Sequence, residues 1–192
     1  MAKLYFIYST MGSGKSLQLM SVAYNMDKRN INSLTLKPNI DTRDGENRVY
    51  SRIGISRECI SFSPDDNIFE IVSNNIKDGT KWIFVDESQF MTELQVEQLS
   101  DVVDYLNIDV MCYGLRTDFQ SKLFPGSKRL FELADTIEEI KSTCECGNKT
   151  IINARIDENG HVVSHGPQTL VGGDQKYVSM CRKCYKLNKL SI

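Results

Sequence analysis

Residues Ser9 to Ser16 have the types and the spacing of a loop that binds phosphate. They read Ser-Thr-Met-Gly-Ser-Gly-Lys-Ser, which matches the pattern G-x-x-x-x-G-K-[ST] except that Ser9 stands in place of the first glycine. Gly12 and Gly14 allow the backbone to fold closely around phosphate oxygens, so that successive N–H groups point inward. In this pattern the side chain of Lys15 reaches the β- and γ-phosphates of a nucleotide, and the hydroxyl of Ser16 ligates Mg²⁺.

The residues on either side of this loop favour the phosphate-binding interpretation. Leu4 to Tyr8 is a run of aliphatic and aromatic residues typical of a buried strand, and Lys15 to Arg29 contains no Gly or Pro and is expected to be helical. The N–H groups at the start of a helix form an anion site. The alternative is a glycine-rich turn on which Lys15 is merely exposed. We expect nucleotide binding by Ser9, Thr10, Met11, Gly12, Ser13, Gly14, Lys15 and Ser16.

A pair of carboxylates follows a second strand-like run. Residues 82–85 read Trp-Ile-Phe-Val, and Asp86 and Glu87 come directly after them. An acid at the end of such a strand can face the Mg²⁺ and the phosphates. Asp86 is therefore expected to hold the metal through water, and Glu87 to act as a base. An acidic pair after a strand is usually a solvated helix entry, but beside a phosphate loop it indicates nucleotide hydrolysis or phosphoryl transfer.

Four of the six cysteines occur in two close pairs. The pairs are Cys144 with Cys146 and Cys181 with Cys184. Four thiolates suit a tetrahedral structural zinc site. The first pair is C-x-C where C-x-x-C is usual, but residues two apart on an extended chain point the same way. The other two cysteines, Cys59 and Cys112, fall in strand-like runs and are expected to be small core residues.

Two other interpretations of the cysteine-bearing region remain open. His161 and His165 have the H-x₃-H spacing of the second half of a Cys₂His₂ finger. That finger needs its histidines on a helix, which Gly160 before them and Gly166-Pro167 after them disfavour. The remaining alternative is four reduced cysteines without a metal. We prefer the four-cysteine zinc site to both.

The chain between the two cysteine pairs is 34 residues long. A loop of this length in a compact domain is usually functional. Gly172 and Gly173 allow backbone to approach a ligand closely, and Tyr177 offers a ring and a hydroxyl. We therefore expect a metal clip at the base of a loop that folds over a small molecule.

Length and composition exclude several classes of protein. The chain has 192 residues, a formal net charge of -2 and 25% charged residues. This length suits one domain with a small appendage, since domains commonly have roughly 100–200 residues. A nearly neutral chain is not expected to coat nucleic acid or an anionic membrane. No run approaches the roughly 18 apolar residues of a membrane span, and the N-terminal run predicts a strand, since it lacks the cleavage site of a signal peptide.

Strand-like and helical segments alternate along the first two thirds of the chain. Strands are expected over residues 4–8, 33–37, 81–85 and 109–113, and helices over 15–29, 68–77 and 128–134. Leu17, Met20 and Tyr24 fall on one face of the first helix, and Thr92 and Gln95 match a capping box. The alternation predicts an α/β fold of the P-loop NTPase type, with a mostly parallel sheet covered by helices on both faces. We expect this nucleotide-binding body to span residues 1–140 and a zinc-binding lobe to span residues 141–192.

Three further runs, taken with the cysteine pairs, resemble the zinc-containing, cytosolic type of thymidine kinase. They are residues 86–90 (Asp-Glu-Ser-Gln-Phe), 113–119 (Tyr-Gly-Leu-Arg-Thr-Asp-Phe) and 171–177 (Val-Gly-Gly-Asp-Gln-Lys-Tyr). The resemblance covers nearly the whole chain in the right order. It implies transfer of the γ-phosphate of ATP to the 5′-hydroxyl of thymidine, giving thymidine monophosphate. It also implies that the loop between the cysteine pairs closes over thymidine as a lasso and contacts the base largely through backbone groups.

The resemblance implies a role for individual residues. Glu87 matches the general base that takes the 5′-hydroxyl proton, and Asp86 matches the Mg²⁺-associated carboxylate. Arg43 matches an arginine near the transferred phosphate, where its charge would offset that of the transition state. Ser88 and Gln89 are implied on the ATP side of the site. The implied nucleoside side comprises Phe90, Leu115, Phe119, Phe124, Leu170, Val171, Gly172, Gly173 and Tyr177.

The resemblance also implies cofactors and partners. Structural Zn²⁺ and Mg²⁺ bound with ATP are the expected metals, and a cytoplasmic homotetramer inhibited by thymidine triphosphate is the expected form. Two residues depart from the family pattern. Ser9 replaces a glycine of the phosphate loop, a change expected to alter ATP affinity. The short spacing of the first cysteine pair is expected to weaken zinc retention.

Two further hypotheses compete with the kinase. The first is a P-loop ATPase whose zinc ribbon acts on nucleic acid, in which Glu87 would activate water. The expected lobe has no basic cluster interleaved with aromatic residues, however, and the net charge disfavours a polyanionic partner. The second is a purely structural zinc module with a vestigial phosphate loop. The intact Lys15, Ser16 and Asp86 argue against it.

Overall fold

A parallel β-sheet forms the centre of the protein in a computed structural model, which describes residues 1–40, 47–51, 53–168 and 176–187. Six strands lie in the order β5-β2-β6-β7-β1-β8, and every adjacent pair is parallel. Their bounds are β1 Leu4–Ser9, β2 Asn32–Pro38, β5 Ile60–Phe62, β6 Thr80–Val85, β7 Asp109–Leu115 and β8 Thr136–Glu139. The expected parallel α/β sheet is confirmed.

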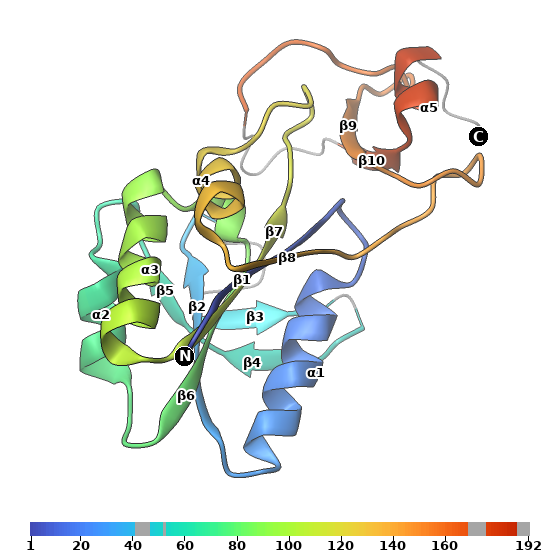
Figure 1. Cartoon of the computed structure of the whole chain (residues 1–192). Helices are drawn as coiled ribbons and strands as arrows, with labels where there is room; N and C mark the ends of the chain where they lie inside the picture. The colour runs from blue at the N-terminus through green and yellow to red at the C-terminus, as the bar shows by residue number, and fades with distance from the viewer. Residues whose placement is uncertain (41–46, 52, 169–175, 188–192) are drawn as a thin grey trace.

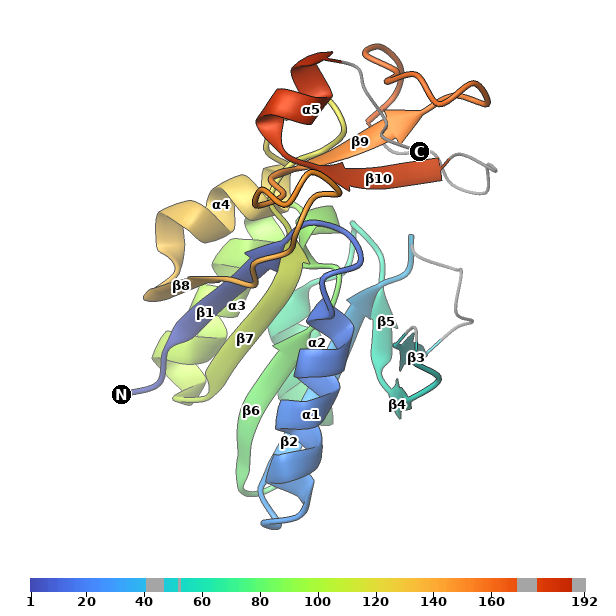
Figure 2. The same cartoon turned by 90° about the vertical axis from the view of Figure 1, so that its right-hand side faces the viewer.

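Helices cover both faces of the sheet. Helix α1 (Lys15–Asp27) lies on one face, while α2 (Ile68–Asn75), α3 (Glu93–Leu106) and α4 (Pro125–Leu133) lie on the other (Figures 1 and 2). A short 3₁₀ turn, η1 (Ser88–Phe90), follows β6. Parallel strands need crossover connections, and helices supply most of them here. This arrangement brings the carboxyl ends of β1, β6 and β7 to one edge of the sheet.

Two apolar cores hold these layers together. Alternate residues of β1 point to opposite faces. Phe6 therefore belongs to the core under α2, α3 and α4 with Leu99, whereas Ile7 belongs to the core under α1 with Leu19. All four side chains are at most 4% exposed. The two cores explain why the central strands are nearly continuous apolar runs.

The helix predicted after the phosphate loop forms, but its buried face differs from the apolar residues singled out in the sequence. Met20 is buried as part of the α1 core, whereas Leu17 is 37% exposed and Tyr24 is 58% exposed. The buried face instead carries Leu19 and Ala23. Apolar residues occur on more than one side of α1, so their spacing alone does not identify the side that meets the sheet.

The capping box predicted at the start of α3 is confirmed. The Thr92 hydroxyl accepts a hydrogen bond from the Gln95 N–H at 3.1 Å, and the Gln95 side chain accepts one from the Thr92 N–H at 3.1 Å. The Gln95 amide also donates to the carbonyl of Ser63 at 2.8 Å. The cap therefore fixes both the start of α3 and the loop before α2.

Several short strands have no counterpart in the sequence-based expectations. An antiparallel hairpin of β3 (Arg48–Tyr50) and β4 (Ser56–Glu58) lies in the polar segment after β2. Strand β5 follows directly, and β8 adds an edge beside β1. Each has three or four residues, which is too short for a periodic apolar pattern to stand out.

The C-terminal part contains a separate ribbon. Strands β9 (Ile152–Ile156) and β10 (Lys176–Met180) pair antiparallel, and helix α5 (Arg182–Leu187) follows. Both views place this ribbon beyond the carboxyl ends of β1 and β7 (Figures 1 and 2). The six-stranded sheet lies within residues 1–140 and the ribbon within 141–192, and the division into two domains at that point stays a prediction. Within the described ranges, no helix combines the length and the apolar character needed to cross a membrane.

The end of β7 packs against η1 at a position that only glycine fits. A Cβ atom on the buried Gly114 would lie 2.6 Å from the Ser88 hydroxyl oxygen and 3.1 Å from the backbone nitrogen of Gln89. Gly114→Ala should therefore displace η1 and lower the free energy of unfolding by about 1–3 kcal/mol, the usual cost of overpacking. Denaturant unfolding of both proteins would measure this.

A second substitution separates the steric effect at Gly114 from a general loss of packing. Ser88→Ala removes the oxygen closest to the added methyl group, together with a hydrogen bond of 3.0 Å to the Tyr113 carbonyl. We expect the double variant to be less destabilised than the sum of the two single variants, because neighbouring substitutions that relieve a clash are not additive. Additive effects, or an unchanged stability of Gly114→Ala, would contradict the close packing described here.

Candidate active site and metal site

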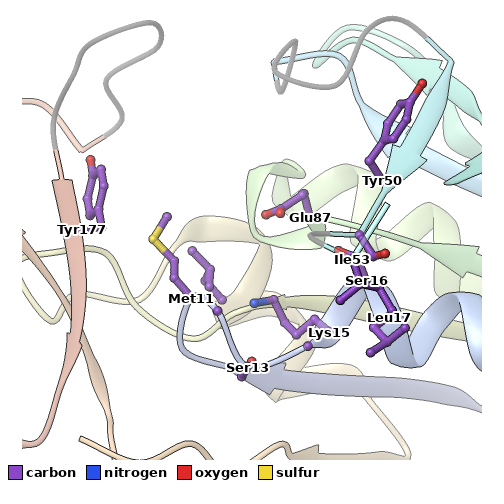
Figure 3. Close-up of a pocket in the computed structure, with 13 residues that line it drawn as sticks. Met11, Ser13, Lys15, Ser16, Leu17, Tyr50, Ile53, Glu87 and Tyr177 are labelled. Atoms are coloured by element: carbon purple, nitrogen blue, oxygen red, sulfur yellow. The ribbon is translucent and has the colours of Figure 1, made fainter. Parts of the chain in front are cut away.

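A cleft of about 680 Å³ opens at the carboxyl edge of the sheet (Figure 3). The phosphate loop and the start of α1 form its floor, and β10 and the β3–β4 hairpin contribute its sides. Its lining residues are Met11, Gly12, Ser13, Gly14, Lys15, Ser16, Leu17, Tyr50, Ser51, Ile53, Glu87, Leu115 and Tyr177. Ligands of parallel α/β proteins bind at this edge of the sheet.

The phosphate loop has the backbone conformation expected for its glycines. Gly12 has a φ of 74° and Gly14 has a φ of 87°, both in the left-handed region that residues with a Cβ avoid. A Cβ atom on Gly14 would meet no atom within 4 Å, so the dihedral angle, not space, requires glycine there. Gly14 is the residue that precedes α1, so the free N–H groups of the helix open into the cleft.

Ser9 fits the loop although the common pattern has glycine at its position. It is the last residue of β1, is 4% exposed and is absent from the residues with positive φ. Its hydroxyl donates to the Thr10 carbonyl at 2.8 Å and also contacts the Ser13 hydroxyl. The serine therefore adds a hydrogen bond inside the loop and requires no strained backbone.

Lys15 lies beneath the loop with its side chain only partly accessible. It is 7% exposed, lines the cleft, and its ammonium group donates to the Thr10 carbonyl at 3.2 Å. The Ser13 hydroxyl donates to the same carbonyl at 2.9 Å. The loop thus holds the ammonium group of Lys15 at the floor of the cleft, where a phosphate group could bind it.

Asp86 meets Ser16 although the strands that lead to them are not neighbours. The Ser16 hydroxyl donates to Asp86 Oδ2 at 2.9 Å, while β7 lies between β1 and β6 in the sheet. Asp86 is 3% exposed, and its other oxygen, Oδ1, is buried without a hydrogen-bond partner among the described residues. Burial raises the pKa of Asp86 to about 7 and the charge of Glu87 adds to this rise, while hydrogen bonds from the Ser16 hydroxyl and the Glu87 backbone oppose it. A cation bound here would compensate the buried charge.

Glu87 lies beside Asp86 and points into the cleft (Figure 3). Its φ of 50° is in the left-handed region, which is uncommon for a residue with a long side chain and costs on the order of 1–3 kcal/mol. The Gln89 amide donates to Glu87 Oε2 at 2.5 Å, and the Gln89 oxygen accepts a hydrogen bond from the Leu115 N–H at 2.9 Å. Gln89 is 1% exposed, so it ties the carboxylate to the end of β7.

The predicted nucleoside-side residues divide into two groups. Leu115 and Tyr177 line the cleft. Phe90 and Phe124 contact each other edge to face, with ring centroids 5.8 Å apart, and Phe119 is 1% exposed. None of these three phenylalanines is among the described lining residues of the cleft.

Five of the predicted site residues lie outside the described residues. They are Arg43, Leu170, Val171, Gly172 and Gly173.

The cleft also includes residues that the sequence-based reasoning missed. Tyr50, Ser51 and Ile53 come from the β3–β4 hairpin and line the cleft together with the phosphate loop. Tyr50 is 39% exposed and Ile53 is 65% exposed. No motif marks this segment. The one available signal was an apolar side chain, Ile53, in a polar segment of the sequence. Such a residue is only weak evidence for a binding site.

A second group of residues that the sequence-based reasoning missed lies in the C-terminal part and forms hydrogen bonds with the phosphate loop. The Met11 N–H donates to the Asn153 side chain at 2.7 Å, and the Ser179 hydroxyl donates to the Met11 carbonyl at 2.8 Å. The hydroxyls of Thr10 and Thr150 share a hydrogen bond of 2.9 Å. These partners are more than 135 residues apart in the sequence, so local patterns cannot reveal them.

Four cysteine thiols converge at the base of the ribbon. The sulfur atoms of Cys144, Cys146, Cys181 and Cys184 all lie within 4.8 Å of one another, and those of Cys146 and Cys181 are 3.5 Å apart. Four sulfurs around one Zn²⁺ at about 2.3 Å lie roughly 3.8 Å apart. The cluster is therefore suited to a metal such as zinc. The predicted ligands do come together, and in the described part of the chain they include no histidine.

The first cysteine pair reaches the cluster by a turn, not by the extended chain that the spacing had suggested. The Gly147 N–H donates to the Cys144 carbonyl at 2.8 Å, and Gly147 has a φ of 84°. Hydrogen bonds from Asn148 lower the pKa of the Cys146 thiol to about 6, which favours the thiolate that metals bind. The tight turn explains how the short C-x-C spacing can still present both sulfurs.

The remaining cysteines and the histidines lie away from the cluster. Cys59 is 9% exposed and Cys112 is fully buried, and burial raises the pKa of both thiols, which confirms them as core residues. His161 Nδ1 lies 3.5 Å from Asp157 Oδ2, and His165 Nδ1 shares a hydrogen bond with the hydroxyl of the neighbouring Ser164. Both histidines are exposed on the chain after β9.

Comparisons with known proteins agree on one family. The sequence model described as "Thymidine kinase" matches residues 2–185. Among curated proteins, a thymidine kinase of Mannheimia succiniciproducens is 50% identical, covering 97% of this chain and 96% of its own. One of Rhodopirellula baltica is 48% identical over 97% and 89% of the two chains, and one of Haemophilus influenzae is 47% identical over 97% of each.

Replacing one cysteine of the cluster tests the metal site. Cys181→Ser should reduce the bound metal to well below one ion per chain, because a structural site needs all four thiolates. Elemental analysis of the dialysed protein would measure this, with zinc as the metal supplied. Cys59→Ala is the matched control, since it also removes a buried thiol but lies outside the cluster. Equal metal content in Cys181→Ser and in the unaltered protein would exclude the four-cysteine site.

Proposed function

The chain belongs to the thymidine kinase family, and from this we propose that it transfers the γ-phosphate of ATP to the 5′-hydroxyl of thymidine. The observation that carries the proposal is the convergence of three groups in one cleft. The phosphate loop forms the cleft floor, Ser16 and Asp86 are hydrogen-bonded to each other, and Glu87 points into the same space. These are the groups that phosphoryl transfer requires.

The phosphate loop would bind the ATP phosphates. Its N–H groups and the start of α1 supply positive potential. Lys15 is positioned to exchange its hydrogen bond with the Thr10 carbonyl for one with a phosphate oxygen. Because Lys15 is nearly buried, its charge would act at short range and with little screening by water.

The residues at the Ser16–Asp86 contact fit a magnesium ion. Both are oxygen donors, which this ion prefers, and the unpartnered Asp86 Oδ1 is a buried acceptor that a cation would satisfy. Ser16 and Asp86 would hold the ion, directly or through water. When bound with ATP, the ion would offset the negative charge of the phosphates.

Glu87 would act as the general base. Its carboxylate would accept the proton of the 5′-hydroxyl as the oxygen attacks the γ-phosphorus, while the bond from that phosphorus to the bridging oxygen breaks and ADP leaves. The hydrogen bond from Gln89 fixes one carboxylate oxygen and leaves the group directed into the cleft. A base held in position in this way contributes roughly 10²–10⁴ in rate.

The nucleoside would bind on the side of the cleft that Leu115 and Tyr177 form. The family resemblance assigns Phe90, Phe119 and Phe124 to the same side, with the lasso of Leu170, Val171, Gly172 and Gly173 over the base. It assigns Arg43 and Ser88 to the ATP side. These assignments rest on the matched sequence runs.

Zinc is the metal that we propose for the four cysteines. Four thiolates leave no open position for substrate, so the ion would serve structure and not catalysis. The family resemblance further supports a cytoplasmic homotetramer that thymidine triphosphate inhibits. Unpaired cysteines agree with a reducing compartment. The competing hypothesis, an ATPase acting on nucleic acid, receives no support from the comparisons.

An ADP-coupled assay run across the common nucleosides tests the proposed reaction. We expect ADP to form with ATP, Mg²⁺ and thymidine together, and to be unaffected by single-stranded DNA. Phosphate release that requires DNA and ignores thymidine would contradict the kinase and favour the ATPase.

Replacing Glu87 tests the base. Glu87→Gln keeps the shape and the hydrogen bond to Gln89 but cannot accept a proton, so kcat should fall about 10²–10⁴-fold. The dissociation constants of ATP and thymidine should change little, as titration calorimetry would show. Glu158→Gln is the control, because Glu158 is exposed in the turn after β9. An unchanged kcat in Glu87→Gln would show that another group takes the proton.

A further inference from the structure

Among the described residues, the largest fully buried side chain belongs to Arg155, the last residue but one of β9. It is 1% exposed. A guanidinium group loses its hydration when it is buried, which is unfavourable unless hydrogen bonds and opposite charges replace the water. In the part of the chain that the structure describes, Arg155 forms no ion pair with a carboxylate. The groups around it in the described part of the chain are neutral.

Those neutral groups are two aromatic side chains and one carbonyl. The guanidinium carbon lies 3.7 Å from the ring centroid of Phe119 and 5.5 Å from that of Tyr177. A cation over the face of an aromatic ring is attracted by the negative potential of that face. Arg155 Nη2 also donates to the Pro167 carbonyl at 3.0 Å. Phe119 and Tyr177 are both residues that the proposed function places on the nucleoside side.

The Tyr177 hydroxyl receives two hydrogen bonds from the same guanidinium group. Arg155 Nε donates to Tyr177 Oη at 3.1 Å, and Nη2 donates to it at 2.9 Å. A phenol oxygen can accept hydrogen bonds and has one hydrogen to donate. With its lone pairs directed at Arg155, the hydroxyl can interact with a further group only as a donor.

The chain on the other side of the guanidinium group encloses it closely. A Cβ atom on Gly166 would lie 3.3 Å from Arg155 Nη1, which is tighter than an ordinary contact. Gly166 also has a φ of 131°, which L side chains rarely adopt. The absence of a side chain at Gly166 therefore allows the backbone at Pro167 to accept its hydrogen bond. Arg155 thus joins β10, the turn that contains Phe119 and the chain at residues 166–167.

We propose that Arg155 is a positioning residue for the nucleoside side of the cleft. It fixes the ring planes of Phe119 and Tyr177, and it makes the Tyr177 hydroxyl a hydrogen-bond donor toward an acceptor oxygen of the substrate. The inference rests on the proposed function, because it concerns how that reaction's nucleoside is held. It does not place Arg155 in contact with the substrate.

Arg155→Lys is the first test. Lysine keeps the charge but has neither the planar fork nor the flat face that stacks on a ring. We expect KM for thymidine to rise about tenfold or more, in line with the loss of charge-assisted hydrogen bonds. KM for ATP should stay within about threefold, because the phosphate loop is held by other residues of the ribbon. Arg129→Lys, on the surface of α4, is the matched control and should change neither constant.

A double-mutant cycle with Tyr177→Phe separates positioning from a purely structural role. Tyr177→Phe removes the hydroxyl and leaves the ring. If Arg155 acts through that hydroxyl, Arg155→Lys should raise KM for thymidine by less than about threefold in the Tyr177→Phe background. Effects that multiply independently, or a KM for ATP that rises in step with that for thymidine, would overturn the proposal.

Two controls keep the outcomes distinct. Failure of the unaltered protein to phosphorylate thymidine would refute the proposed function, whereas an active unaltered protein with an unchanged KM in Arg155→Lys would refute only the positioning role. Metal content and thermal unfolding of each variant would establish that it is folded. Should Arg155→Lys not fold, Phe119→Leu takes its place, since it removes the ring that supports the guanidinium group and should raise KM for thymidine in the same way. A Phe119→Leu protein with an unchanged KM would overturn the proposal.

Discussion

The hydrogen bond between Ser16 and Asp86 depends on how tightly three adjacent segments pack. Strand β7 separates the two strands that lead to these residues, yet Ser16 at the start of α1 meets Asp86 directly after β6. The residues that follow form η1, which packs against the end of β7 because Gly114 has no side chain in its path. Glu87, the residue before η1, lines the cleft with an unfavourable φ. The candidate site thus depends on the close packing of α1, η1 and the end of β7.

Much of the fold and part of the site could be predicted because the relevant signals are local. The phosphate loop, the capping box at Thr92 and the two cysteine pairs each depend on residues a few positions apart. Long apolar runs likewise mark the central parallel strands. The choice of Leu19 over Leu17 as a core residue depends instead on where α1 meets the sheet, and periodicity alone does not contain that information.

The features that could not be predicted depend on contacts between residues far apart in the sequence. Asn153 and Arg155 belong to no motif that the reasoning from sequence used, yet one holds the phosphate loop and the other contacts two aromatic residues. Each is a polar side chain in a short strand, which a pattern of alternating polarity would place at the surface. Both are buried because groups from other segments satisfy them, and only the folded structure shows those groups.

The hydrogen bonds between the ribbon and Met11 have a consequence for the order in which parts of the protein fold. Met11 and Ser179 are 168 positions apart, and contacts at such separation form late because closing a long loop has a large entropic cost. During synthesis the phosphate loop leaves the ribosome well before the residues of the ribbon that hold it. The phosphate loop therefore gains these contacts only after the chain has been made as far as Ser179.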